Sequence, residues 1–172
     1  PRRAQDPGAM FAAPRHGTGF SGRSGREPRR RGGLQYAIAF GIDGAGGQVV
    51  VTADRVLVLD DTRVSVNGRT SGGKINLGGG FQGRDSTISN AENLTVGSGA
   101  TLSADSSIGN GGQVVVWSDK ETYFEGSVSA RATGDQGGHG GFIEVSGKET
   151  LTVLGGVDAS SISGRPGTVL FD

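Results

Sequence analysis

The sequence predicts an all-β protein built as a right-handed parallel β-helix, a solenoid of about five rungs of roughly 26 residues with three short strands each. Two observations predict this class. A Gly-Gly pair recurs in front of the same kind of strand, and apolar residues alternate with polar or small ones inside each copy. A fixed period of 20 to 50 residues is the signature of a solenoid. Right-handed winding follows from the preference of parallel crossover connections.

The Gly-Gly pair sets the period of the repeat. The second glycine of each pair lies at positions 47, 73, 112 and 141, and a degenerate copy, Pro166-Gly167, follows, so the steps are 26, 39, 29 and 26 residues. The second and fourth residues after each pair are apolar, which is the two-residue period of a strand. These pairs are Val49 and Val51, Ile75 and Leu77, Val114 and Val116, Ile143 and Val145, and Val169 and Phe171.

Two further strands are expected in each copy. The second strands are Leu57–Leu59, Leu94–Val96, Thr122–Phe124 and Leu151–Val153, and the third strands are Val64–Val66, Leu102–Ala104, Val128–Ala130 and Val157–Ala159. Glycines are expected at the corners between strands, where close backbone approach or a positive φ is needed. A sandwich or barrel with hairpins is the competing all-β architecture, but only Asn67-Gly68 has the form of a tight hairpin turn.

The chain divides into two parts. Residues 1–36 hold eight arginines against Asp6 and Glu27, together with four of the five prolines, and residues 37–172 carry the repeats. Arg, Gly and Pro dominate the first part, which has too few apolar residues to offset the entropy lost on folding, so a disordered leader is expected there. No aromatic residues are interleaved with its arginines in the way typical of nucleic-acid recognition, and no nucleic-acid partner is expected.

The step of 39 residues carries about 13 extra residues, which predicts an insertion near 80–93. Insertions in solenoids often form the binding face. A loop that is tolerated because closure entropy grows slowly with length is an equal alternative. The sequence has no cysteine, which excludes disulfides and thiolate metal sites, and no apolar run approaches the 18 residues of a transmembrane helix.

Several segments resemble a known family. Residues 111–119 read Gly-Gly-Gln-Val-Val-Val-Trp-Ser-Asp, residues 140–147 read Gly-Gly-Phe-Ile-Glu-Val-Ser-Gly, and residues 164–172 read Gly-Arg-Pro-Gly-Thr-Val-Leu-Phe-Asp. The chain is similar in these segments to the repeat region of filamentous-haemagglutinin-like exoproteins, the large adhesins that Gram-negative bacteria export by two-partner secretion. The resemblance is strong over 111–172, fair over 44–110 and absent from 1–36.

The resemblance implies a shaft segment of an adhesin on the bacterial cell surface or in the extracellular medium, without catalysis or cofactor. It implies an outer-membrane two-partner secretion transporter as the partner during export, and a host-cell surface or a polysaccharide as ligand of the rungs. The Asn-Pro-Asn motif of that family's secretion domain does not occur in the sequence, so we expect a piece of a longer protein. A polysaccharide lyase or hydrolase on the same fold, and a gene fragment without function, are the alternatives.

Candidate catalytic acids follow or lie within the first strands of the copies, at Asp54, Asp119 and Glu144. Asp54 and Asp119 are equivalent in the repeat and two rungs apart, about 10 Å at the usual strand spacing. That distance suits the carboxylate pair of an inverting glycosidase. We favour solvated polar turns instead, because no Arg or Lys recurs beside them to hold a sugar acid, and no catalytic residue is predicted.

Two other features were weighed as sites. Asp135 and His139 lie in a glycine-rich stretch that faintly resembles a calcium-binding repeat, but tandem aspartates are missing, so a turn is favoured over a metal site. Trp117 is the fifth residue after its Gly-Gly pair and is expected just past the strand, near a corner. Packing at the edge of the core is favoured for it over an exposed ligand contact.

Overall fold

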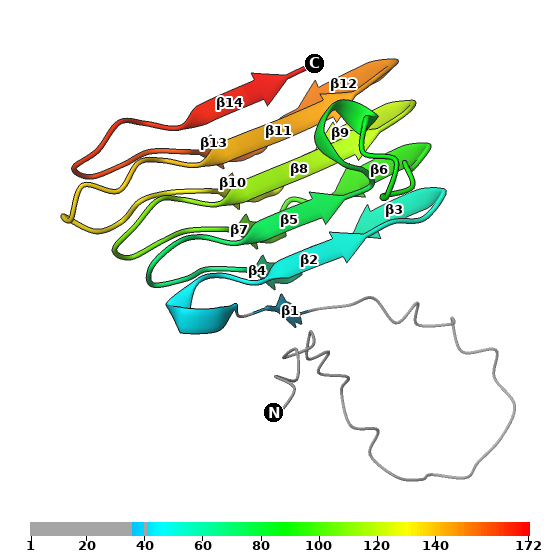
Figure 1. Cartoon of the computed structure of the whole chain (residues 1–172). Helices are drawn as coiled ribbons and strands as arrows, with labels where there is room; N and C mark the ends of the chain where they lie inside the picture. Colours follow the sequence, from blue (N-terminus) through cyan, green and yellow to red (C-terminus); the bar gives the residue numbers. More distant parts are fainter. Residues whose placement is uncertain (1–35, 40) are drawn as a thin grey trace, which may run out of the picture.

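The computed structural model describes residues 36–39 and 41–172, and the leader expected over 1–36 lies outside these residues except for Tyr36. The fold is an all-β parallel solenoid of about four turns, with three sheets and almost no helix (Figure 1). Every pair of neighbouring strands is parallel, and each strand pairs with its counterpart in a neighbouring turn. The predicted fold class is confirmed.

Each turn of the chain contributes one short strand to each sheet. The first sheet contains β2 (Gln48–Val51), β5 (Lys74–Leu77), β8 (Gln113–Ser118), β11 (Phe142–Gly147) and β14 (Thr168–Phe171). The second contains β3 (Arg55–Val58), β6 (Asn93–Val96), β9 (Glu121–Phe124) and β12 (Thr150–Val153). The third contains β1 (Tyr36–Ile38), β4 (Arg63–Ser65), β7 (Thr101–Ser103), β10 (Ser127–Ser129) and β13 (Gly156–Asp158). Two single-turn 3₁₀ segments, η1 (Ile42–Gly44) and η2 (Phe81–Gly83), complete the elements.

The core is a set of columns of aliphatic side chains inside the solenoid. In the first sheet Val49, Ile75, Val114 and Ile143 lie in register and are buried. In the third sheet Val64, Leu102 and Val128 form a second column. Burying each such side chain contributes about 1.5–3 kcal/mol, so the columns supply much of the driving force that the backbone ladders alone lack.

Two expectations about the repeat were wrong. The fold has about four turns rather than five, because the degenerate last copy contributes only β14, in which Phe171 is 50% exposed. The second strand of the first copy is Arg55–Val58 rather than Leu57–Leu59. Val56 and Val58 pair with Leu94 and Val96 and point inward, which leaves Leu57 52% exposed.

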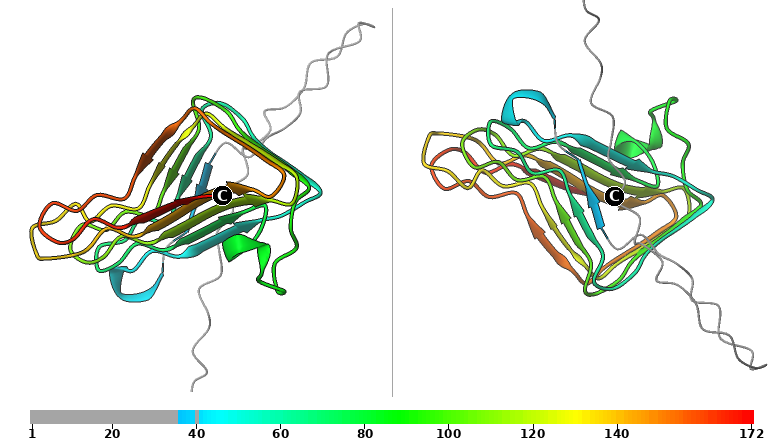
Figure 2. Two further views of the ribbon diagram at one scale, coloured as in Figure 1. Left: turned by 90° about the horizontal axis from the view of Figure 1, so that it is seen from above. Right: turned by 90° about the horizontal axis from the view of Figure 1, so that it is seen from below.

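The Gly-Gly pairs lie where two segments of each turn approach each other. We call these two segments walls: one leaves the third sheet and the other enters the first sheet. Seen from above in Figure 2, the three sheets surround a triangular space, and the chain between the third and first sheets extends beyond it as a flattened tongue. At the base of the tongue Gly112 N–H donates to Ala104 O at 2.7 Å across the two walls, and Gly141 does the same to Ala130 at 2.7 Å. A Cβ on Gly112 would overlap the carbonyl oxygen of Gly73 in the turn before. The glycines are therefore required by close approach of backbones.

The insertion, defined here as residues 78–92 between β5 and β6, lies against the outer face of the first sheet (Figures 1 and 2). It starts at Gly78 with φ of 74° and contains η2, in which Gln82 and Gly83 also have positive φ. Its chain rejoins the solenoid through Ala91 N–H, which donates to Gly78 O. The extra residues of the second copy thus fold back as a cover on strands of later turns.

Candidate functional site

The insertion buries part of the first sheet that would otherwise face outward. Val115 and Trp117 point out of the solenoid from β8, yet Val115 is fully buried and Trp117 is only 6% exposed. The Trp117 ring lies against Gly83, where a Cβ would come 2.5 Å from the ring. Phe81 of the insertion meets Phe142 of β11 edge to face, with ring centroids 5.5 Å apart. The sequence favoured a packing role for Trp117, and the ring is packed under the insertion. Trp117 was expected just past the strand, but it lies within β8.

Glu144 is the buried charged group under the insertion. It points outward from β11 and is 0% exposed. The Gln82 N–H lies 3.1 Å from each of its carboxylate oxygens, and the Ser146 hydroxyl donates to Oε1 at 3.1 Å. Burial raises the pKa of Glu144, the bonds from Gln82 and Ser146 oppose that rise, and Asp172 adds to it. The carboxylate of Glu144 therefore anchors the insertion to the sheet.

Asp119 forms a second anchor for the insertion. Its Oδ1 accepts the indole N–H of Trp117 at 3.1 Å and the side-chain amide of Asn90 at 3.1 Å. Asn90 also donates to Gly83 O at 3.0 Å, so it connects both limbs of the insertion to the end of β8. Within the described residues, the buried Oδ1 of Asn90 has no hydrogen-bond donor.

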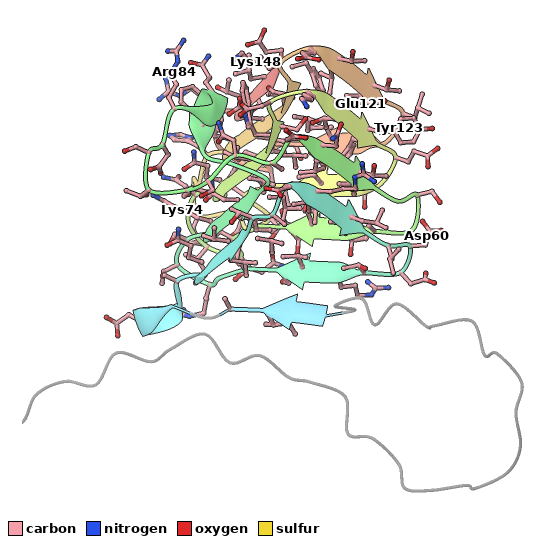
Figure 3. All side chains as sticks on the ribbon, turned by 90° about the vertical axis from the view of Figure 1, so that its right-hand side faces the viewer. Asp60, Lys74, Arg84, Glu121, Tyr123 and Lys148 are labelled. Carbon is pink, nitrogen blue, oxygen red and sulfur yellow. The ribbon has the colours of Figure 1, made fainter. Side chains whose placement is uncertain are left out.

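A pocket of about 410 Å³ opens beside these anchors and is lined by Gln82, Gly83, Arg84, Asn90, Trp117, Asp119, Lys148 and Asp172. Figure 3 shows Arg84 and Lys148 near the upper end of the solenoid, well above Lys74. Both Arg84 and Lys148 are exposed. The indole N–H of Trp117 and the side-chain NH2 of Asn90 already bond within the protein, whereas Asn90 Oδ1 does not, and the pocket lies at the edge of the packed insertion.

The three candidate acids do not form a common site. Asp54 O accepts the N–H of Glu92, and Glu92 O accepts the N–H of Lys120, so Lys120 is the structural equivalent of Asp54 two turns on. The expected equivalence of Asp54 and Asp119 was wrong by one residue. Val51 and Arg55 are four positions apart in the first copy, whereas their register equivalents Val116 and Glu121 are five positions apart in the third. Asp54 is exposed, whereas Asp119 and Glu144 bind the insertion.

Asp135 and His139 lie in the tongue and have local partners. Asp135 accepts the side-chain amide of Gln136, and His139 Nδ1 accepts the N–H of Arg165 at 3.0 Å. Among the described residues, no group of three or more His, Cys, Asp or Glu side chains is arranged to hold a metal ion. Residues 134–136 form a bend within the tongue.

A shallow trough runs along the solenoid axis over the Gly-Gly column. Its volume is about 720 Å³. We call it the glycine trough, and its lining is Gly72, Gly73, Lys74, Asn110, Gly111, Gly112, Gln113, His139, Gly140, Gly141, Phe142, Arg165, Pro166, Gly167 and Thr168. Sequence reasoning identified its glycines but missed the polar residues beside them. The signal was present, because the residues directly before and after the Gly-Gly pairs are mostly polar.

Comparison with known proteins gives one informative similarity. No protein-family model matches the chain. No curated protein matches it either. A solved structure, the crystal structure of the HMW1 secretion domain from Haemophilus influenzae, is similar with a TM-score of 0.62 and 25% sequence identity. The similarity covers 80% of this chain and 35% of that chain, so the present chain spans about a third of the length of its neighbour. In the part of the chain that the structure describes, no helix is long and apolar enough to cross a membrane.

Proposed function

We propose that this chain is a β-solenoid segment of a filamentous-haemagglutinin-like adhesin that is exported by two-partner secretion. It acts at the cell surface or outside the cell as an extended scaffold that presents side-chain ladders for binding. Its partner during export is an outer-membrane transporter of the two-partner type. No catalytic step is assigned to it.

The observation that carries the proposal is the similarity to a secretion domain. The TM-score of 0.62 and the identity of 25% over 80% of the chain support a relationship to that secretion domain. The motifs at 111–119 and 140–147, which led to the same secretion class from sequence, form β8 and β11 and lie side by side in the first sheet. The motifs and the structural similarity both support export.

A scaffold role is supported by where the distinctive residues lie. Trp117 and Glu144, the most distinctive residues of the two motifs, pack under the insertion instead of facing an open cleft. Asp54 and Asp119 are not equivalent in the repeat register. Trp117, Asp119 and Glu144 each have a partner within the fold, which supports a scaffold role.

The test is the location of the protein in its source bacterium. An antibody against the chain is used on whole cells, culture medium and cell lysate, with external protease added to intact cells. The proposal predicts protein in the medium or in a protease-accessible surface form, and its retention inside the cell when the two-partner transporter gene is deleted. A cytoplasmic control protein must resist the protease. Unchanged location after the deletion, or protease resistance until lysis, would overturn the proposal.

A further inference from the structure

We propose that His139 is a pH-sensitive latch that holds the last segment of the tongue, residues 159–167, to the turn before it. The latch is closed while the imidazole is neutral and opens when the ring takes up a proton. It is a property of the solenoid itself and does not depend on the export or the adhesive role proposed above.

A ladder of hydrogen bonds runs along the two walls of the tongue. In each bond a side chain of one turn accepts the backbone N–H of the equivalent residue in the next turn. The acceptor is a side-chain oxygen in three of these bonds and a ring nitrogen in the last. The acceptor and donor pairs are Asn67 with Asp105, Asp105 with Arg131, Asn110 with His139, and His139 with Arg165, at 2.7, 2.7, 2.8 and 3.0 Å. The last bond of the ladder is therefore the one that a proton on a ring nitrogen can break.

The contact with Arg165 fixes the protonation state of the ring. Nδ1 of His139 accepts the N–H of Arg165, so Nδ1 carries no hydrogen and the neutral ring holds its hydrogen on Nε2. When Nδ1 takes up a proton from solvent, two N–H groups face each other and the bond to Arg165 is lost. Histidine is the side chain whose charge ordinarily changes between about pH 5 and 8. The latch is therefore closed above this range and opens as the pH falls through it.

The ring lies directly against the backbone that it holds. A Cβ on Gly164 would come 2.6 Å from Nδ1 of His139. The carbonyl of Arg165 accepts the N–H of Gly140 at 2.9 Å, so both backbone groups of Arg165 bond to the turn before. Loss of the His139 bond leaves the carbonyl of Arg165 attached and frees its N–H to exchange with solvent.

A charged imidazole gains no ion pair at this position. The lining of the glycine trough around His139 contains the cations Lys74 and Arg165 and no carboxylate. Within the described residues His139 forms no salt bridge. Other charged groups in the neighbouring turns of the tongue have partners of their own, namely Asp105, Arg131, Asp135 and Asp158. Protonation therefore removes a contact without supplying another.

The effect of opening is local. Two serine hydroxyls also connect the last segment to the turn before, since Ser161 donates to Gly138 O and Ser163 accepts the N–H of Gly137. Hydroxyl groups do not change their charge in this pH range. The strand β14 also pairs with β11 through backbone groups. The latch therefore releases the stretch around Arg165 in mild acid while the solenoid stays folded.

The experiment is solution NMR on the isotope-labelled full chain at about pH 7.5 and about pH 5.5, on either side of the usual titration of histidine. Long-range proton–nitrogen spectra report which ring nitrogen of His139 carries hydrogen, and we expect an unprotonated Nδ1 at the higher pH. Amide exchange, corrected for the intrinsic effect of pH, reports the protection of the Arg165 N–H. That protection should fall about fivefold at the lower pH, as expected for the loss of one hydrogen bond. The N–H of Asp105, which donates to Asn67, is the internal control and should keep its protection.

Matched variants separate the latch from a general effect of acid. His139→Asn places at this position the side chain that Asn110 has one turn earlier, so the Arg165 N–H should stay protected at both pH values. His139→Ala removes the acceptor and should leave this N–H weakly protected at both. The sequence has one other histidine, His16, and His16→Asn should keep the response of the parent chain.

A hydrogen on Nδ1 of His139 at the higher pH would overturn the proposal, as would equal protection of the Arg165 N–H at the two pH values. The same pH response in His139→Asn as in the parent chain would also contradict it. This variant decides the matter if His139→Ala does not fold.

Discussion

The backbone N–H of Gln82 lies 3.1 Å from both carboxylate oxygens of Glu144, although the two residues are 62 positions apart in the sequence. Gln82 belongs to the insertion after β5, and Glu144 lies on β11, two strands further along the first sheet. The insertion therefore ties one turn of the solenoid to another that is not its neighbour. Contacts that skip a turn are uncommon in repeat proteins, whose units mainly contact their direct neighbours.

This anchor should make stability depend on pH. Burial raises the pKa of Glu144 in the folded state above its value of 4.5 in the unfolded chain. The resulting contribution to folding is fully present below the unfolded pKa and is lost as pH rises through the folded pKa. Thermal melts of Glu144→Gln should not show this loss of stability between the unfolded and the folded pKa of Glu144. The parent protein and Glu149→Gln, a control at an exposed carboxylate, should show it. An unchanged pH slope in Glu144→Gln would contradict the role of the buried carboxylate.

Trp117 should be the main apolar support of the insertion. Trp117→Ala removes a ring that is 6% exposed, and truncation of a buried aromatic of this size costs about 3–5 kcal/mol. Tyr123→Ala, on the outer face of the second sheet, should cost about 1 kcal/mol or less. Urea denaturation measures both, and limited proteolysis should cut Trp117→Ala first within residues 78–92. Similar costs for the two variants would indicate that the insertion does not pack on Trp117.

Asp105 should stabilise the start of the tongue. Its Oδ1 accepts the Arg131 N–H at 2.7 Å, and its Oδ2 accepts the guanidinium at 2.7 and 3.1 Å, which raises the pKa of Arg131. Asp105→Ala leaves a backbone donor unpaired and should cost about 1–3 kcal/mol. Asp135→Ala, an exposed control in the same tongue, should stay within about 0.5 kcal/mol. Equal melting temperatures for Asp105→Ala and Asp135→Ala would refute the stabilising role of Asp105.

The sequence was sufficient for the columns of the core. Val114 and Ile143 could be placed because a fixed distance from a Gly-Gly pair combines with a two-residue period. The strand at Arg55–Val58 was misplaced because Val56 to Leu59 are all apolar, so alternation does not distinguish the inner face from the outer. Only its pairing with β6 decides which residues point inward.

The candidate site was less predictable because it depends on distant contacts. Local patterns do not reveal that Gln82, with a φ of 52°, turns its N–H toward Glu144. The tongue was also missed, since its two walls close through bonds such as Gly112 N–H to Ala104 O. A corner and a closure between walls both require glycine, and the residue type alone does not separate them.

The recurring Gly-Gly pair connects the sequence, the fold and the glycine trough, so its role is the central claim. Gly112→Ala places a Cβ into the carbonyl of Gly73, whereas a Cβ on Gly156 meets nothing within 4 Å. The most direct measurement is the free energy of unfolding of Gly112→Ala beside Gly156→Ala. We predict a loss of more than about 4 kcal/mol, or no folded protein, for Gly112→Ala, and a change within about 1 kcal/mol for Gly156→Ala. Equal and small effects at both positions would contradict the account.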